Sequence, residues 1–138
     1  MALRPLYLAD KSALARMAHV SVARRLGPLL AHGRIATCPI IDLEVLYSAR
    51  SHADYEAILV ERNAMPSFPL DERVSSRAMD VQRQLARRGQ HRLPLSDLLI
   101  AATAESNDLG VIHYNADYDR IARVTGQHTE WVAPRGTL

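Results

Sequence analysis

The chain of 138 residues has little cysteine, lysine or aromatic side chain, and it lacks long apolar runs. Its single cysteine, Cys38, cannot form an internal disulfide, and its six histidines do not show the spacing of zinc ligands. No apolar stretch is long enough to cross a bilayer, and the N-terminus lacks the basic segment and apolar core of a secretory signal. We therefore expect a cytoplasmic protein with no membrane partner.

The glycine and aromatic residues lack the spacing of two common kinds of site, the glycine-rich nucleotide-binding loop and the aromatic surface on which bases stack. The six glycines make neither a G-x-G-x-x-G pattern nor a Walker-type loop. The five tyrosines, Phe68 and Trp131 lack the spacing of a platform on which bases stack. Contact with a nucleic acid would therefore have to depend on the charge and shape of its backbone.

Basic charge is supplied almost wholly by arginine, since Lys11 is the only lysine among the 17 Lys and Arg residues. The planar guanidinium suits bidentate contact with phosphate or carboxylate, although genomic base composition can produce the same bias. Arg87, Arg88 and Arg92 are candidates for contact with a nucleic-acid backbone, and a solvated arginine face is the simpler interpretation of each. The net charge of +2 decides nothing by itself.

Apolar residues make up 48% and charged residues 23% of the chain, the ordinary mixture of a globular protein, and we expect one domain over residues 1–138. Five short segments have the character of strands: 7–9, 34–38, a minimal strand at Phe68 between two prolines, 110–113 and 129–132. Helical spacing marks 11–19, a segment from Val22 to Leu30 that Gly33 ends, 41–49, 53–64, 72–88, 97–106 with Ser96 as its cap, and 118–125. Helix 97–106 is apolar nearly all round and should be central. This alternation predicts an α/β fold with a largely parallel sheet and right-handed crossovers.

Four acidic residues should meet at one edge of this sheet: Asp10, Glu44, Asp97 and Asp117. Asp10 follows the first strand and Asp117 follows the strand 110–113, and parallel strands end at the same edge. Glu44 lies early in the helix after the second strand, and Asp97 opens the helix that leads to 110–113; these helices begin at that edge too. Open α/β folds usually bind ligands there. Taken singly, each acid has a simpler role as a helix cap, a first-turn acid or a solvated helix residue.

Convergence of four acids has an electrostatic cost that must be offset. Two carboxylates about 4 Å apart repel by roughly 4 kcal/mol at an effective dielectric constant near 20. A helix N-terminus recovers only about 0.3–1 kcal/mol for each charge, so a divalent cation or arginines must supply the difference. Ligation by oxygen alone points to Mg²⁺ or Mn²⁺, which can activate a water for the hydrolysis of a phosphodiester.

Four stretches carry these residues: YLADKSAL at 7–14, the isolated Glu44 within IIDLEVLYSAR, LPLSDLLIAATA at 93–104 and VIHYNADYDRIA at 111–122. In this order and at this length, they resemble the PIN-domain ribonucleases, and specifically the VapC-type toxins of bacterial toxin–antitoxin pairs. The resemblance spans nearly the whole chain. It implies a three-layer α/β/α sandwich with a mostly parallel sheet of about five strands, often dimeric, in which three or four acids hold Mg²⁺ or Mn²⁺ and RNA is cleaved.

The resemblance also implies roles for single residues. Asp10, Glu44 and Asp97 would be the core catalytic and metal-binding acids, with Asp117 as the fourth member. Ser12 corresponds to a small hydroxyl residue that supports the first aspartate through hydrogen bonds, and an ordinary hydroxyl in a first helical turn is an equally good interpretation.

The chain departs from the family at two positions. Lys11 stands where the family often has threonine or another small polar residue, and Asn115 stands where related toxins often have an aspartate. An amide can coordinate through its oxygen but carries no charge, so we expect Asn115 to orient a ligand or water. Asp117 matches the acid before the aromatic residue of the last motif, and Asp119 is expected to pair with Arg123 at i,i+4 spacing.

The expected partners are an RNA substrate, a second copy of the chain and a small antitoxin that lies across the acidic groove and inserts an arginine or lysine. A housekeeping nuclease and a catalytically silent RNA- or protein-binding module on the same fold are the alternatives. Other phosphate-handling enzymes fit less well. A haloacid-dehalogenase-type phosphatase needs an aspartate where Ser12 stands, and a response-regulator receiver needs an acidic pair and a late lysine that are absent.

Overall fold

The computed structural model describes residues 3–138, and a parallel sheet lies at its centre. The strands are β1 (Tyr7–Ala9), β2 (Ile35–Ala36), β3 (Gly110–His113) and β4 (Thr129–Trp131), in the order β2-β1-β3-β4. Each neighbouring pair is parallel, and Leu8 of β1 lies opposite Ala36 of β2 and Val111 of β3. The predicted α/β fold with a parallel sheet is confirmed.

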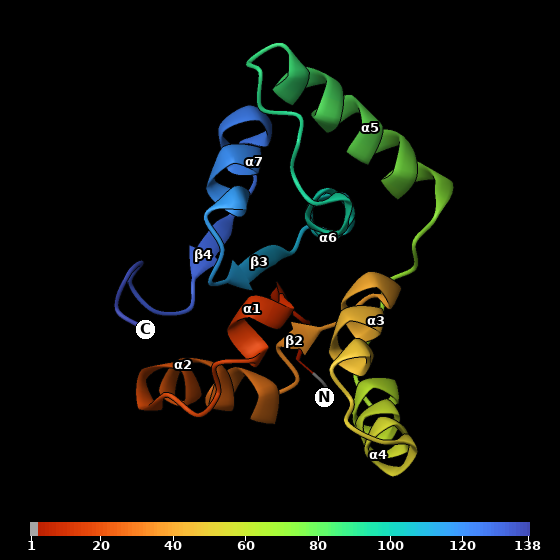
Figure 1. Cartoon of the computed structure of the whole chain (residues 1–138), viewed down its shortest axis with the longest axis vertical. Helices are drawn as coiled ribbons and strands as arrows, with labels where there is room; N and C mark the ends of the chain where they lie inside the picture. Colours follow the sequence, from red (N-terminus) through yellow and green to blue (C-terminus); the bar gives the residue numbers. More distant parts are fainter. Residues whose placement is uncertain (1–2) are drawn as a thin grey trace.

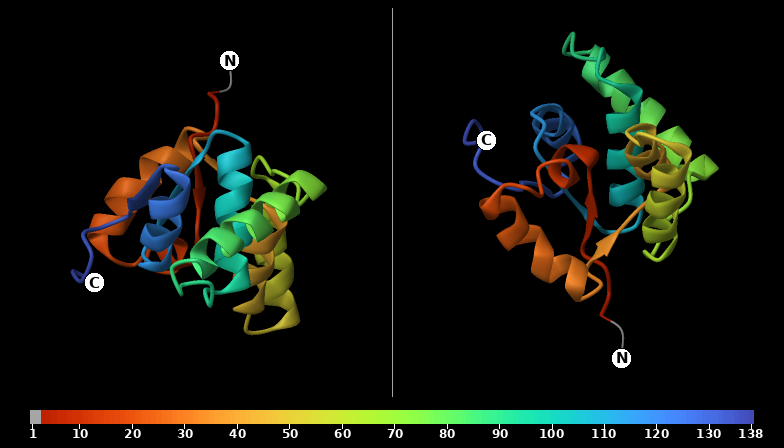
Figure 2. Two further views of the ribbon diagram at one scale, coloured as in Figure 1. Left: turned by 90° about the horizontal axis from the view of Figure 1, so that it is seen from above. Right: turned by 60° about the horizontal axis from the view of Figure 1, so that its bottom comes forward.

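Helices cover both faces of this sheet. They are α1 (Lys11–Leu14), α2 (Val20–Ala31), α3 (Pro39–Tyr47), α4 (His52–Asn63), α5 (Glu72–Ala86), α6 (Leu95–Ser106) and α7 (Asp117–Thr125). In Figure 1, α5, α6 and α7 lie above the sheet and α1 and α2 lie below it, while α3 and α4 stand beside the β2 edge. Figure 2 shows the same arrangement from two further sides. None of these helices of residues 3–138 is long and apolar enough to cross a membrane.

The two faces of the sheet are buried in two apolar cores. Successive side chains of a strand point to opposite faces. Leu8 and Val111 accordingly pack with the inner residues of α5, α6 and α7, whereas Ala9 and Ile112 pack with those of α1 and α2. Helix α6 is buried along most of its length, as its apolar sequence predicts.

The expected strand at Phe68 is reduced to a single bridge. Thr37 pairs with Ser67 in parallel orientation, and the Phe68 N–H donates to the Thr37 carbonyl at 3.0 Å. The prolines on both sides have no N–H to donate, so the pairing cannot continue. The regular sheet of the described residues therefore has four strands rather than five.

Two helix boundaries also differ from expectation. The segment 11–19 forms a helix only as far as Leu14 and continues as turns to the start of α2. Ser96 is not the cap of α6, because the helix already begins at Leu95, and the carbonyl of Pro94 accepts the Asp97 N–H at 3.1 Å. Asp97 nevertheless lies in the first turn, at the carboxyl edge of the sheet.

Candidate active site

Asp10 lies directly after β1 and is held through both carboxylate oxygens. Its backbone N–H donates to the carbonyl of Ile112 on β3 at 2.9 Å. The Ser12 N–H donates to Oδ2 at 3.0 Å, and the Ser12 hydroxyl donates to the same oxygen, which makes Asp10 the N-cap of α1. The hydroxyl of Tyr118 on α7 donates to Oδ1 at 2.8 Å. Only 4% of Asp10 is exposed, so the carboxylate is both buried and oriented.

Ser12 connects the loops that follow β1 and β3. Its Oγ donates to Asp10 and accepts the N–H of Tyr114 at 2.9 Å. The structure thus places the hydroxyl and the N–H of Ser12 on the acid that they are expected to support. A hydroxyl that both donates and accepts in this way fixes the spacing of the two loops.

Asp97 is 5% exposed in the first turn of α6 and is oriented by an amide. Nδ2 of Asn115 donates to Asp97 Oδ2 at 3.0 Å, and Oδ1 of Asn115 accepts the Asp117 N–H at 3.0 Å. The backbone N–H of Asn115 donates to Nδ1 of His113 at 3.1 Å. Asn115 therefore connects the starts of α6 and α7, with its amino group on the buried acid.

Burial, together with the surrounding negative charge, raises the pKa of Asp97 from its ordinary 3.8 to about 7. The charge of Asp10 is the next cause after burial, and those of Asp117 and Glu44 act in the same direction. The hydrogen bond from Asn115 opposes the rise. In the structure, Asp10, Glu44 and Asp117 are thus near enough to Asp97 for their charges to raise its pKa.

Glu44 contributes a buried oxygen that has no hydrogen-bond partner. It lies half-buried on α3, and its Oε1 has no partner among the described residues. Burial raises the pKa of Glu44, as does the charge of Asp10, while the charge of Lys11 and a hydrogen bond with Ser96 lower it. An unpaired buried acceptor costs about 1–3 kcal/mol, so a cation or a proton would be favoured here.

The two aspartates of α7 have different partners. Asp117, the first residue of the helix, pairs with Arg120, Nη1 to Oδ1, at 2.8 Å. The carboxylate of Asp119 accepts the indole N–H of Trp131, with 3.2 Å and 3.3 Å to its two oxygens. The expected pair between Asp119 and Arg123 is therefore wrong, and Arg123 makes no ion pair within residues 3–138. Trp131 of β4, which packs beside α7, takes this carboxylate instead.

The four acids supply the oxygen atoms that a metal ion could bind, but their side chains are not placed around a common point. No three Asp, Glu, His or Cys side chains of the described part of the chain lie close enough together to hold a metal ion. Asp97 accepts a hydrogen bond from Asn115, and Asp117 pairs with Arg120. The oxygen donors, the unpartnered Oε1 of Glu44 and the excess negative charge nevertheless fit Mg²⁺ or Mn²⁺. Side-chain rotation would have to complete such a site.

The rings of Tyr118 and Trp131, which donate to Asp10 and Asp119, both pack against the ring of His113, an arrangement that the sequence does not predict. The His113 ring lies 4.9 Å from that of Tyr118 and 5.1 Å from that of Trp131, between centroids. Burial lowers the pKa of His113 to about 4, so the ring is neutral and can accept the Asn115 N–H. The sequence motif includes Tyr118 as the aromatic residue after Asp117, but it does not predict that the Tyr118 hydroxyl donates to Asp10.

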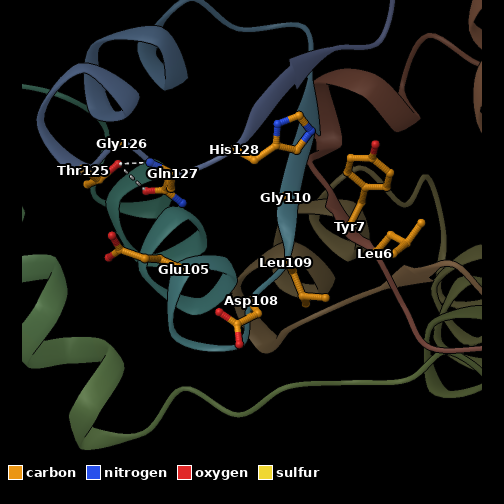
Figure 3. Close-up of a pocket in the computed structure, with 10 residues that line it drawn as sticks. All are labelled: Leu6, Tyr7, Glu105, Asp108, Leu109, Gly110, Thr125, Gly126, Gln127 and His128. Atoms are coloured by element: carbon orange, nitrogen blue, oxygen red, sulfur yellow. Dashed lines mark hydrogen bonds between the residues drawn. The ribbon is translucent and has the colours of Figure 1, made fainter.

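Two hollows of about 420 Å³ lie at opposite edges of the sheet. One adjoins the acids and is lined by Lys11, Ile40, Leu43, Glu44 and Tyr47. The other, shown in Figure 3, lies where the strands begin and is lined by Leu6, Gly110 and His128 among others. It is also lined by Glu105, which is paired with Arg77 at 2.6 Å, and by Asp108. Only the first hollow belongs to the candidate site.

The three arginines that the sequence suggested for RNA contact are exposed. Arg87 and Arg88 follow α5 and, with Gln84 and Val124, surround a hollow of about 200 Å³ between α5 and α7. Arg92 lies in the loop that leads to α6. None of the three forms an ion pair with the described residues, so their charge is available to a ligand.

Sequence comparison finds relatives along nearly the whole chain. The family model described as PIN domain matches residues 7–124. The chain is 43% identical over 135 residues to ribonuclease VapC51 of Mycobacterium tuberculosis, with 96% of each chain covered. It is 42% identical over 135 residues to ribonuclease VapC18 of the same organism, with 96% of this chain and 98% of the relative covered.

Solved structures share the fold at lower identity. The DNA-bound VapBC of Salmonella typhimurium matches with a TM-score of 0.73 at 19% identity, covering 94% of this chain and 99% of that one. VapBC-1 of nontypeable Haemophilus influenzae matches with a TM-score of 0.74 at 19% identity, covering 92% and 98%. These likenesses agree with the three-layer arrangement of Figure 1.

Proposed function

The chain belongs to the PIN-domain family, and within it to the VapC ribonucleases, and on this premise we propose that it is an endoribonuclease toxin of a toxin–antitoxin pair. The proposal includes dependence on Mg²⁺ or Mn²⁺ and a cytoplasmic site of action. The observation that carries it is the pKa of Asp97, which burial and the negative charges of Asp10, Asp117 and Glu44 raise to about 7. Such a set is costly in a folded protein unless a cation neutralises it.

The four acids would hold the metal, and their neighbours would position them. A bound Mg²⁺ or Mn²⁺ supplies a water of lowered pKa and stabilises charge on the phosphate. Ser12 and Tyr118 fix the carboxylate of Asp10, and Asn115 orients Asp97. The unpartnered Oε1 of Glu44 is available either to the metal or to the proton of the attacking water.

RNA would be bound through its phosphates. Arg87 and Arg88 lie beside the last turn of α7, at the end of that helix away from Asp117, and Arg92 precedes α6; all three are exposed and free of ion pairs in the part of the chain described. Arginine binds phosphate in bidentate fashion, and such contacts weaken as the salt concentration rises. Substitution of these residues should therefore raise the KM for RNA and reduce its dependence on salt, with kcat little changed.

The proposed antitoxin has a suitable surface beside the acids. The hollow lined by Lys11, Ile40, Leu43, Glu44 and Tyr47 is mainly apolar and borders the acidic set, and Leu43 and Tyr47 are exposed. A segment with apolar side chains and one arginine or lysine would match both features. A second copy of the chain could cover the apolar hollow of about 230 Å³ between α5 and α6, where Met79 and Leu95 are exposed.

Cleavage of labelled RNA by purified protein tests the enzymatic proposal. Cleavage should require Mg²⁺ or Mn²⁺, stop in excess EDTA and be lost in Asp97→Asn. Asp80→Asn, which changes an exposed aspartate on α5, is the matched control and should cleave normally. Full activity in EDTA would contradict the metal mechanism. A wild type that binds Mn²⁺ and RNA but cleaves nothing would favour the silent binding module.

A further inference from the structure

The hydroxyl of Tyr118 is buried where packing alone would not require it. Tyr118 has 0% of its surface exposed, and its ring packs in the core beneath α5 and α6 and against His113. A phenylalanine would fill the same volume. Because a buried hydroxyl costs free energy unless it is hydrogen-bonded, its role must lie at its partner, Oδ1 of Asp10, 2.8 Å away.

The hydrogen bonds of Asp10 leave it a single open position. An ionised carboxylate has about four acceptor positions, two on each oxygen. The N–H and the hydroxyl of Ser12 occupy both positions on Oδ2, and the hydroxyl of Tyr118 occupies one on Oδ1. What remains is one lone pair on Oδ1, in a carboxylate that cannot rotate without breaking these bonds.

We propose that Tyr118 is a positioning residue that fixes the carboxylate plane of Asp10 and reserves one acceptor position on Oδ1 for a metal ion. The inference rests on the proposed function, because it takes Asp10 as a metal ligand. Asp97 differs, since Asn115 alone donates to its side chain among the described residues. The site would therefore combine a rigid acid just after β1 with a more adaptable acid on α6.

Tyr118→Phe removes only the hydroxyl and tests this role. Loss of a group that orients a metal ligand typically costs about 10–100-fold in metal affinity or activity. We expect the affinity of the metal-free protein for Mn²⁺, measured by electron paramagnetic resonance of free Mn²⁺, to fall by about tenfold or more. The kcat for RNA cleavage should fall similarly, while KM stays within about twofold because a fully buried residue cannot touch RNA.

Tyr7→Phe is the matched control. Tyr7 is the first residue of β1, and its hydroxyl donates to Glu130 at 3.2 Å and accepts from Arg25 at 3.2 Å, at the end of the strand away from Asp10. The same atom is removed without touching the acids. Mn²⁺ affinity and kcat should therefore stay at wild-type values.

A second variant separates orientation from stability. Incorporation of 4-aminophenylalanine in place of Tyr118 restores an N–H donor on the same ring and should recover most of the lost Mn²⁺ affinity, with thermal melting as the check on folding. Wild-type affinity and kcat in Tyr118→Phe, a change in KM alone, or equal losses in Tyr7→Phe would each overturn the inference. A wild type that binds Mn²⁺ but does not cleave RNA would refute the proposed function and leave this inference to be decided by Mn²⁺ affinity.

Discussion

Replacement of Asp97 by asparagine should stabilise the metal-free protein at alkaline pH. The pKa of Asp97 rises from 3.8 to about 7 on folding, so between these values the folded protein holds a proton that the unfolded chain has lost. Stability therefore falls as pH rises from about 4 to about 7 and stays low above that range, where Asp97 is ionised among other acids. Asparagine removes the charge and keeps an oxygen that can accept the hydrogen bond from Asn115.

The magnitude follows from the pKa and the burial of Asp97. The difference between 3.8 and about 7 corresponds to at most about 4 kcal/mol, at about 1.4 kcal/mol per pKa unit. Solvent screens little of this at 5% exposure, but the new amide N–H₂ must find a partner. We expect a gain of about 1–3 kcal/mol at alkaline pH, or about 3–10 °C in Tm.

Urea and thermal unfolding in EDTA, from mildly acidic to alkaline pH, provide the measurement. Subtracting the free energy of unfolding of the wild type from that of Asp97→Asn cancels the contributions of the other titrating groups. His113 is one of these: its pKa is lowered from 6.5 to about 4 in the folded protein, so its contribution makes stability rise with pH between those two values. Asp80→Asn, at an exposed ion pair with Arg77, should change stability by less than about 1 kcal/mol. A gain in Asp97→Asn that does not shrink toward acidic pH, or a loss at alkaline pH, would refute the reasoning.

Other substitutions should separate the remaining acids. Asp10→Asn should abolish cleavage and lower the free energy of unfolding, measured in urea, by about 1–3 kcal/mol. Both carboxylate oxygens of Asp10 accept hydrogen bonds, and the amide nitrogen of asparagine cannot accept one. Unchanged stability would contradict this. Asp117→Asn should weaken Mn²⁺ binding and cleavage more than Asp119→Asn does, whereas Asp119→Asn should alter the fluorescence of Trp131; the reverse order would exchange their roles. Wild-type expression should arrest growth unless the partner is co-expressed, and Asp97→Asn should not; harmless expression of an active wild type would indicate a housekeeping nuclease.

Much of the scaffold could be predicted because it depends on local pattern. The strands Tyr7–Ala9 and Gly110–His113 are short apolar runs between turn signals, and the structure has both with the expected bounds. The apolar sequence of α6 likewise predicts its central position. The prediction that Asp10 and Asp97 lie at the same edge of the sheet needed only one rule. Parallel strands end at one edge, and the helices that connect them begin there.

Side-chain partners could not be predicted in the same way. The bond from Tyr118 to Asp10 joins residues 108 positions apart, and no local spacing encodes it. Local spacing favoured Arg123 as the partner of Asp119, but Trp131 arrives from a separate strand. At Phe68 the apolar character suggested a strand, and the missing proline N–H groups prevented one.

The central position of β1 sets the order in which the site can be completed during synthesis. Its partner β3 begins only at Gly110, and Tyr118 follows later still. Until those residues have left the ribosome, one edge of β1 stays unpaired, which exposes it to pairing with other chains, and Asp10 lacks one of its hydrogen bonds. A truncated chain thus carries Asp97 without Asn115, its hydrogen-bond donor, and Asp10 without Tyr118. Nuclease activity should be absent from nascent fragments that end before Tyr118.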